Sequence, residues 1–217
     1  AAPQSTVEAA TIMADNKMTG GSSAWMVRVT PENGGDDARL RDMIVERNWF
    51  ISGAGTQMAV NSDAAESTFR NNIFDTTADI YHGCLAVNQW GSAPAPYGHR
   101  IYHNTFYSGA AGDFKAVSIG ATATNVIVVN NLAWAPLATS PVMIFGTGAS
   151  GLVQSNNSTD AQVENTDPGW ASATPATPAD FKPVAGSYAL DAGLAVPVFS
   201  DFFLQDRATY GLGAAQP

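Results

Sequence analysis

Short segments in which apolar residues lie two positions apart, each closed by asparagine, recur along this chain. In one of them Val126 and Val128 precede Asn131. Residues two apart share a face of a β-strand, so each segment predicts a strand with one buried face, followed by a turn. The arrangement occurs at residues 43–50, 67–74, 99–106 and 126–133, more weakly at 152–159, and in an earlier candidate at 12–16.

The shared asparagines mark an internal repeat. They are Asn48, Asn72, Asn104, Asn131 and Asn157, and consecutive members lie 24, 32, 27 and 26 residues apart. Such spacing is typical of solenoids, in which each repeat forms one coil of a stack. Asparagine suits a sharp turn, because it tolerates left-handed backbone and its side chain bonds nearby backbone groups. We therefore expect the five asparagines to form a ladder in which each amide bonds to the next.

Two further patterns follow the same repeat. Phe50, Phe74 and Phe106 come at a fixed offset after the asparagines and are expected to stack inside the coils. A second family of apolar segments lies between the asparagine turns, so each coil holds at least two strands. Its members are residues 57–60, 84–87, 116–119 and 142–145. Helix signals are weak, and only residues 6–14 favour a helix, which would cap an end of the stack.

Composition supports a turn-rich β protein and excludes several classes. Charged residues make up 13% of the 217 residues, against about 25% in typical proteins. Coiled coils need more Glu, Lys and Arg, and disordered chains carry more charge with less apolar residue. The formal net charge of −9 argues against a nucleic-acid partner. The single cysteine, Cys84, excludes an intrachain disulfide, and no apolar run is long enough to predict a membrane span.

The repeated strand, the Asn-Asn pairs and the aromatic residue after them resemble the right-handed parallel β-helix of the pectate-lyase-like superfamily. Residues 181–193, which end in Asp-Ala-Gly, resemble the closing segment of secreted bacterial β-helix proteins, as do Asp206-Arg207 and the final Gly213-Ala214. The resemblance implies an all-β right-handed parallel β-helix (a β-solenoid) of about five to six coils. We assign residues 36–165 to the coils, 1–35 to an N-terminal segment that forms a cap or first coil, and 166–217 to an irregular tail packed on the helix. Asp191 and Arg207 are expected to pair and fix this tail.

A candidate site follows from the strands that precede the asparagines. If Ile101 and its counterparts point inward, Arg70, Arg100 and Tyr102 point outward, and adjacent coils bring the two arginines about 5 Å apart. His103 lies at the turn, and His82 lies on the intervening segment. Arginine binds carboxylate bidentately, and His or Tyr can transfer protons. These five residues therefore suit β-elimination in a uronate-containing glycan, and the resemblance implies such roles, with Ca²⁺ as a cofactor in some lyases.

Two alternatives stay open for these residues. Outward Arg and Tyr on a solenoid are also ordinary solvated surface. A glycoside hydrolase would instead use paired carboxylates, for which Asp63, Glu66, Asp75 and Asp79 are the nearby acids, although acidic side chains in loops are common. Residues 60–140 hold three basic and five acidic side chains, so a polyanion is weakly attracted unless Ca²⁺ bridges the two.

The resemblance thus implies a secreted or cell-surface, bacterial-type, carbohydrate-related protein; if it is an enzyme, the expected activity is that of a polysaccharide lyase acting on a uronate-containing glycan. The fold also carries non-enzymatic functions, because function depends on the site and not on the fold. The alternative is therefore a surface, adhesin or filament subunit that associates with further copies through its coil ends, where an uncapped stack leaves strand edges open.

Overall fold

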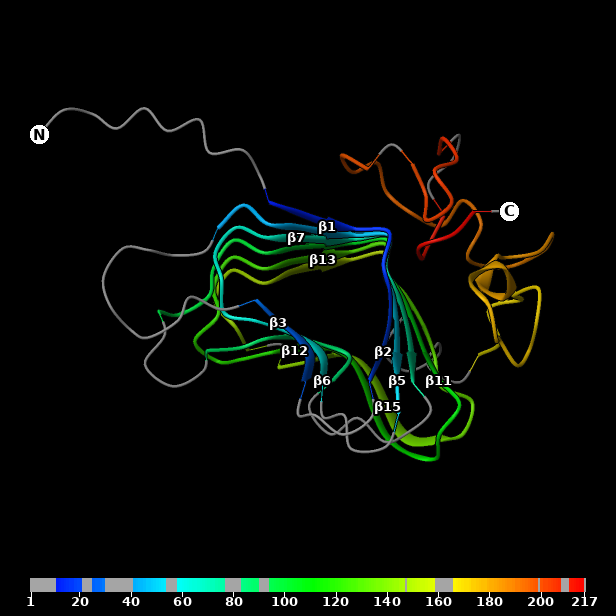
Figure 1. Cartoon of the computed structure of the whole chain (residues 1–217), viewed down its shortest axis with the longest axis horizontal. Coiled ribbons are helices and arrows are strands. Elements are labelled where there is room, and N and C mark those ends of the chain that lie inside the picture. Colours follow the sequence, from blue (N-terminus) through cyan, green and yellow to red (C-terminus); the bar gives the residue numbers. More distant parts are fainter. Residues whose placement is uncertain are drawn as a thin grey trace, which may run out of the picture.

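The computed structural model describes residues 11–20, 25–29, 41–53, 58–76, 83–89, 94–146, 148–158, 166–198, 200–207 and 211–216. Sixteen strands in these ranges form three parallel sheets, which bound a three-sided coil (Figure 1). Sheet A contains β1 (Ile12–Ala14), β4 (Ile44–Glu46), β7 (Thr68–Arg70), β10 (Arg100–Tyr102), β13 (Ile127–Val129) and β16 (Val153–Ser155).

The other two sheets have five strands each. Sheet B contains β2 (Lys17–Gly20), β5 (Trp49–Ser52), β8 (Ile73–Thr76), β11 (Thr105–Ser108) and β14 (Leu132–Trp134). Sheet C contains β3 (Trp25–Val29), β6 (Met58–Ser62), β9 (Leu85–Val87), β12 (Gly112–Ile119) and β15 (Ala138–Phe145). Each coil contributes one strand to each sheet in chain order, so five coils are complete and β16 begins a sixth. The predicted right-handed parallel β-helix of five to six coils is confirmed.

The asparagine repeat corresponds to the turn between sheets A and B. The predicted strands before the asparagines are the strands of sheet A, and the second family belongs to sheet C, where Val60, Leu85, Val117 and Ile144 stand in register. The strands of sheet B, directly after the asparagines, were not predicted as strands. The predicted N-terminal helix is wrong for residues 12–14, which form β1, and residues 6–10 lie outside the described part.

The asparagine ladder is confirmed, and Asn16 adds a sixth member. The Nδ2 of each asparagine donates to the Oδ1 of the asparagine one coil further, over 2.9–3.0 Å. The same Oδ1 also accepts from the backbone N–H of the preceding ladder residue, as Asn72 Oδ1 does from Asn48. The left-handed residue is the one before each ladder asparagine, such as Asn71 with φ 55° or His103 with φ 51°. In each turn, therefore, one residue adopts the left-handed conformation and the next, the ladder asparagine, makes the hydrogen bonds between coils.

The core lies inside the three sheets and is stacked in rows. The rings of Phe50 and Phe74 are 4.9 Å apart and those of Phe74 and Phe106 are 4.8 Å apart, nearly parallel in both pairs. This spacing equals the distance between neighbouring strands, so one phenylalanine from each of three successive coils forms a column, which Met18 and Ala133 extend at its two ends. The predicted inward stack is therefore confirmed.

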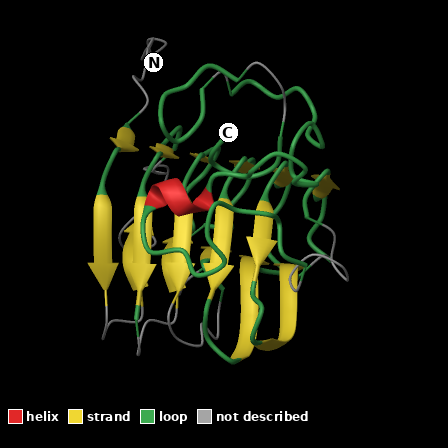
Figure 2. Cartoon of the chain, turned by 90° about the vertical axis from the view of Figure 1, so that its right-hand side faces the viewer, coloured by secondary structure: helices red, strands yellow, loops and turns green. Residues whose placement is uncertain are grey.

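The described residues between 166 and 216 form a mostly irregular tail outside the coils. Its one helical turn, η1 (Pro178–Phe181), lies in front of sheet B (Figure 2). Trp170 and Phe181 of the tail pack with Tyr107 and Trp134 of sheet B in a second apolar cluster. Arg207 donates to Asn71 Oδ1 and to the carbonyls of Ser200, Gly213 and Ala214, so within the described residues the expected pair with Asp191 is wrong. In the described ranges, no helix is long and apolar enough to cross a membrane.

Candidate functional site: a cleft on the outer face of sheet B

The two arginines of the predicted lyase site lie on the outer face of sheet A but do not stand opposite each other. The register places Arg70 between Glu46 and Tyr102, whereas Arg100 lies beside Thr68. The predicted direct pairing of Arg70 with Arg100 is therefore wrong by two residues. The alternation predicted that both residues face outward, but alternation alone leaves the register between coils undetermined.

Arg70 is engaged by neighbouring groups. Its Nε donates to Glu46 Oε2 over 2.6 Å, and its Nη1 reaches the carbonyl of Pro197 in the tail at 3.4 Å. A guanidinium that is already paired with a carboxylate has less capacity to bind a second one. Arg100 is exposed and lines a shallow depression of about 150 Å³, together with the acidic side chains of Asp42 and Glu66.

The proton-transfer candidates of sheet A are covered. Tyr102 is buried against Val129 of sheet A and Val198 of the tail. His103 is fully buried, and its Nε2 lies 3.1 Å from Asn130 Nδ2. Burial, reinforced by the charge of Arg207, lowers the pKa of His103 to about 2, so the imidazole is neutral. The fifth candidate, His82, lies outside the described residues.

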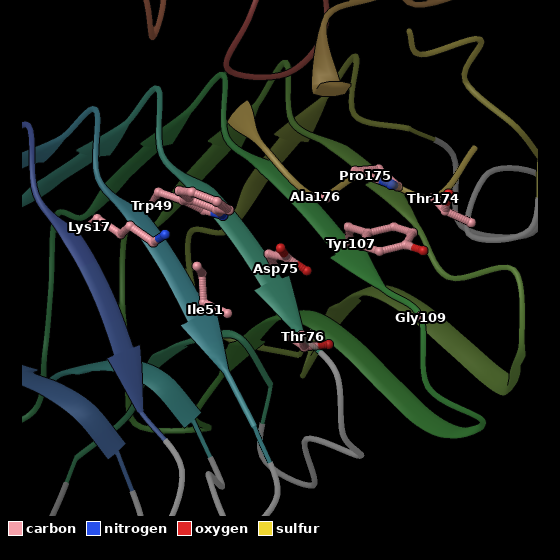
Figure 3. A pocket seen from close by; sticks show the side chains of 10 residues that line it. All are labelled: Lys17, Trp49, Ile51, Asp75, Thr76, Tyr107, Gly109, Thr174, Pro175 and Ala176. Atoms are coloured by element: carbon pink, nitrogen blue, oxygen red, sulfur yellow. The ribbon is translucent and has the colours of Figure 1, made fainter. Parts of the chain in front are cut away.

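A cleft lies instead on the outer face of sheet B, where the tail does not fully cover the strands (Figure 3). Its volume is about 390 Å³, within the range of small-molecule sites. Strands β2, β5, β8 and β11 provide the floor, and a tail loop provides one wall. The lining residues are Lys17, Trp49, Ile51, Asp75, Thr76, Tyr107, Gly109, Thr174, Pro175 and Ala176.

Asp75 is the carboxyl group of this cleft. Phe74 points into the core, so the alternation of β8 turns Asp75 outward, between Ile51 and Tyr107 of the adjacent strands. The residue is only 7% exposed. Burial raises the pKa of Asp75 to about 6, and the nearby indole N–H of Trp49 opposes this shift. A carboxyl group in such a setting can exchange a proton near neutral pH.

A cation and two aromatic side chains accompany Asp75. The Nζ of Lys17 lies 4.4 Å from the ring centre of Trp49, a cation–π contact at the edge of the cleft. Tyr107 is held by the tail, because its ring packs edge-on against Trp170 and Phe181, each at 5.9 Å. Burial, followed by the charge of Asp75, raises the pKa of Tyr107. The phenol therefore remains protonated and can donate a hydrogen bond.

From the sequence alone, Asp75 is an acid that lies either in a loop or in a hydrolase carboxylate pair, and the cleft is not predicted. A signal was present in the repeat itself. Three positions after successive ladder asparagines stand Thr19, Ile51, Asp75, Tyr107 and Trp134, so one acid interrupts a mainly apolar row. Identifying that row as outward requires the strands of sheet B, which the sequence analysis did not predict. The wall of the cleft also comes from residues about 100 positions further along the chain.

Among the described residues, no group of three or more His, Cys, Asp or Glu side chains is arranged to hold a metal ion. Comparison of the chain with protein-family profiles, with curated proteins and with solved structures finds no match.

Proposed function

We propose that this protein is a secreted or cell-surface β-helix of the pectate-lyase-like superfamily that binds a uronate-containing glycan in the sheet B cleft. The observation that carries the proposal is the combination, in one open cleft, of an ammonium group, a carboxyl group and aromatic walls. Saccharide sites need polar groups for the hydroxyls and apolar surface for the sugar faces, with a cation added where the sugar is acidic.

The positions of the polar groups favour a ligand of more than one sugar unit. Lys17 and Asp75 are separated by two strand spacings and two residues, or roughly 12 Å between Cα atoms. Lys17 is exposed and can pair with the carboxylate of one sugar, while Asp75 and Tyr107 bond hydroxyls of another. Because these groups stand on strands of one hydrogen-bonded sheet, their spacing is fixed before the ligand arrives, which lowers the entropic cost of binding.

Binding of short oligogalacturonides, measured by calorimetry, tests this proposal. Lys17→Ala is expected to weaken the affinity roughly tenfold, since it removes one charge-assisted contact. Lys115→Ala is the matched control, because Lys115 also stacks on an aromatic ring, that of Phe145 at 4.7 Å, but lies on sheet C. The absence of binding to the unaltered protein, or an equal loss in both variants, would contradict the proposal.

The same samples test β-elimination. Release of unsaturated product, followed by its ultraviolet absorbance, would add a lyase activity to binding. Arg100→Ala then locates the chemistry, because loss of product release without loss of calorimetric binding would assign the reaction to sheet A. Unchanged product release in this variant, with a loss in Lys17→Ala, would assign it to the cleft.

A further inference from the structure

The surroundings of Asp75 differ from those of a carboxylate that is permanently charged. On the adjacent strands, Asp75 stands between Ile51 and Tyr107. Two residues earlier along the strands, the same face of the sheet carries Trp49 and Ile73. No ion pair joins Asp75 to a basic side chain within the described residues. The nearest cation in the cleft, Lys17, lies over the Trp49 ring.

Few other groups in contact with the cleft can change charge. Strand β2 contributes Lys17, β5 contributes none, β11 contributes Tyr107, and the tail loop Thr174–Ala176 contributes none. On the inner side of the coil, Cys84 is close enough to interact electrostatically with Asp75, and burial raises the pKa of this thiol, so it stays neutral. Between about pH 5 and pH 7.5, Tyr107 remains neutral, because its pKa is raised. Asp75 is the lining group that titrates in this interval.

The two forms of Asp75 have opposite effects on an acidic ligand. An ionised Asp75 repels a uronate carboxylate beside it, and screening of this repulsion is weak because Asp75 itself is almost buried. A protonated Asp75 is neutral and can donate a hydrogen bond to that carboxylate or to a ring oxygen. For a neutral saccharide the preference is reversed, because an ionised carboxylate is the stronger acceptor for hydroxyl groups.

We propose that Asp75 determines the specificity of the cleft: the protonated residue admits acidic saccharides, and the ionised residue favours neutral ones. This inference rests on the proposed function, since it assigns a selector to the same cleft. Asp75 then contacts the ligand directly, and binding of an acidic saccharide is coupled to the uptake of one proton.

Binding of an acidic saccharide is expected to strengthen on acidification. With a pKa of about 6, Asp75 is largely protonated at about pH 5 and only a few per cent protonated at about pH 7.5. If the protonated form alone accepts a uronide, the apparent affinity is reduced by the fraction in that form, so it rises up to about 30-fold on acidification over this interval. A neutral oligogalactoside is expected to bind more weakly at the lower pH.

The experiment measures binding of an oligogalacturonide and of the corresponding neutral oligogalactoside at both pH values. Asp75→Asn is the decisive variant, because the amide has the shape of the carboxylic acid, stays uncharged and can still donate. It is expected to bind the uronide at about pH 7.5 as tightly as the unaltered protein does at about pH 5, with no remaining pH dependence. Asp113→Asn, which removes an exposed acid on β12, is the matched control and should retain the full shift.

Other outcomes overturn the inference in distinguishable ways. If the unaltered protein binds the uronide equally at both pH values, or if Asp75→Asn keeps the shift, Asp75 is not the selector, although the proposed function stands. Loss of uronide binding in a correctly folded Asp75→Asn, verified by its thermal melting, would show that the ionised form is the ligand-binding one. If the unaltered protein binds neither saccharide, the proposed function itself fails.

Discussion

Two columns of residues run side by side along the turn between sheets A and B, and they differ in residue type and in what their side chains contact. The inner column is the ladder, where all six residues from Asn16 to Asn157 are asparagine. The outer column consists of the residues directly before them, Asp15, Arg47, Asn71, His103, Asn130 and Asn156. All six outer residues have positive φ, but their side chains vary: one aspartate, one arginine, one histidine and three asparagines.

The difference arises from what each column contacts. A ladder asparagine bonds to the asparagine of the neighbouring coil, so the same residue type is needed in every coil of the stack. An outer residue faces a different partner in each coil. Arg47 makes a bidentate ion pair with Asp15 in the first two coils, whereas Asn71, Asn130 and Asn156 bond to Ser200, Leu194 and Ala192 of the tail. Pairing with copies of the same residue keeps the ladder uniform. In the outer column, the three residues that bond to the tail backbone are asparagine, whereas Asp15, Arg47 and His103 contact side chains of neighbouring coils and differ in type.

The largest effect is expected from Asn104→Ala in the middle of the ladder. Asn104 is fully buried, its Nδ2 lies near the carbonyls of Phe69 and Tyr102, and its Oδ1 accepts two bonds from Asn72. Removing it leaves several buried groups without partners, so the free energy of unfolding should fall by about 3–5 kcal/mol. Urea denaturation measures this loss. A decrease below about 1 kcal/mol would contradict a structural role for the ladder.

A smaller and more local effect is expected from Asn130→Gly in the outer column. Glycine retains the left-handed backbone, while the reciprocal bonds between the Asn130 amide and the backbone of Leu194 are lost. The cost should be about 2 kcal/mol and should fall mainly on the tail. Hydrogen exchange should therefore increase around Leu194 while strands β7 and β10 keep their protection. Equal loss of protection in the coils would mean that the tail and coils unfold as one unit.

The smallest effect is expected from Arg47→Asn. Asparagine tolerates the left-handed conformation, so the change removes the ion pairs with Asp15 and Glu46 without straining the turn. Because Asp15 is exposed and Glu46 keeps its ion pair with Arg70, the loss should be below about 1 kcal/mol and should shrink further at high salt. Denaturation at low and high ionic strength checks this, together with a rise in the pKa of Asp15, which Arg47 now lowers. A salt-independent loss as large as that of Asn104→Ala would remove the distinction between the columns.

The candidate sites show the same division between repeated and unrepeated features. The repeat predicted that Arg70, Arg100 and Tyr102 share the outer face of sheet A. It did not predict that Val198 of the tail covers Tyr102 or that Pro197 approaches Arg70. Nor did it assign Asp75 to a cleft, because the wall formed by Thr174–Ala176 belongs to a segment with no place in the repeat.

The sequence by itself determined the stack: the asparagine ladder, the phenylalanine column, two of the three strand families and the approximate number of coils. These features follow from contacts between equivalent positions of neighbouring coils, so a period in the sequence is sufficient to specify them. Only the tertiary structure decided where the tail lies, which outward residues it buries and which cleft it leaves open. Those contacts join the repeat to a segment that does not repeat, and no periodic signal records them.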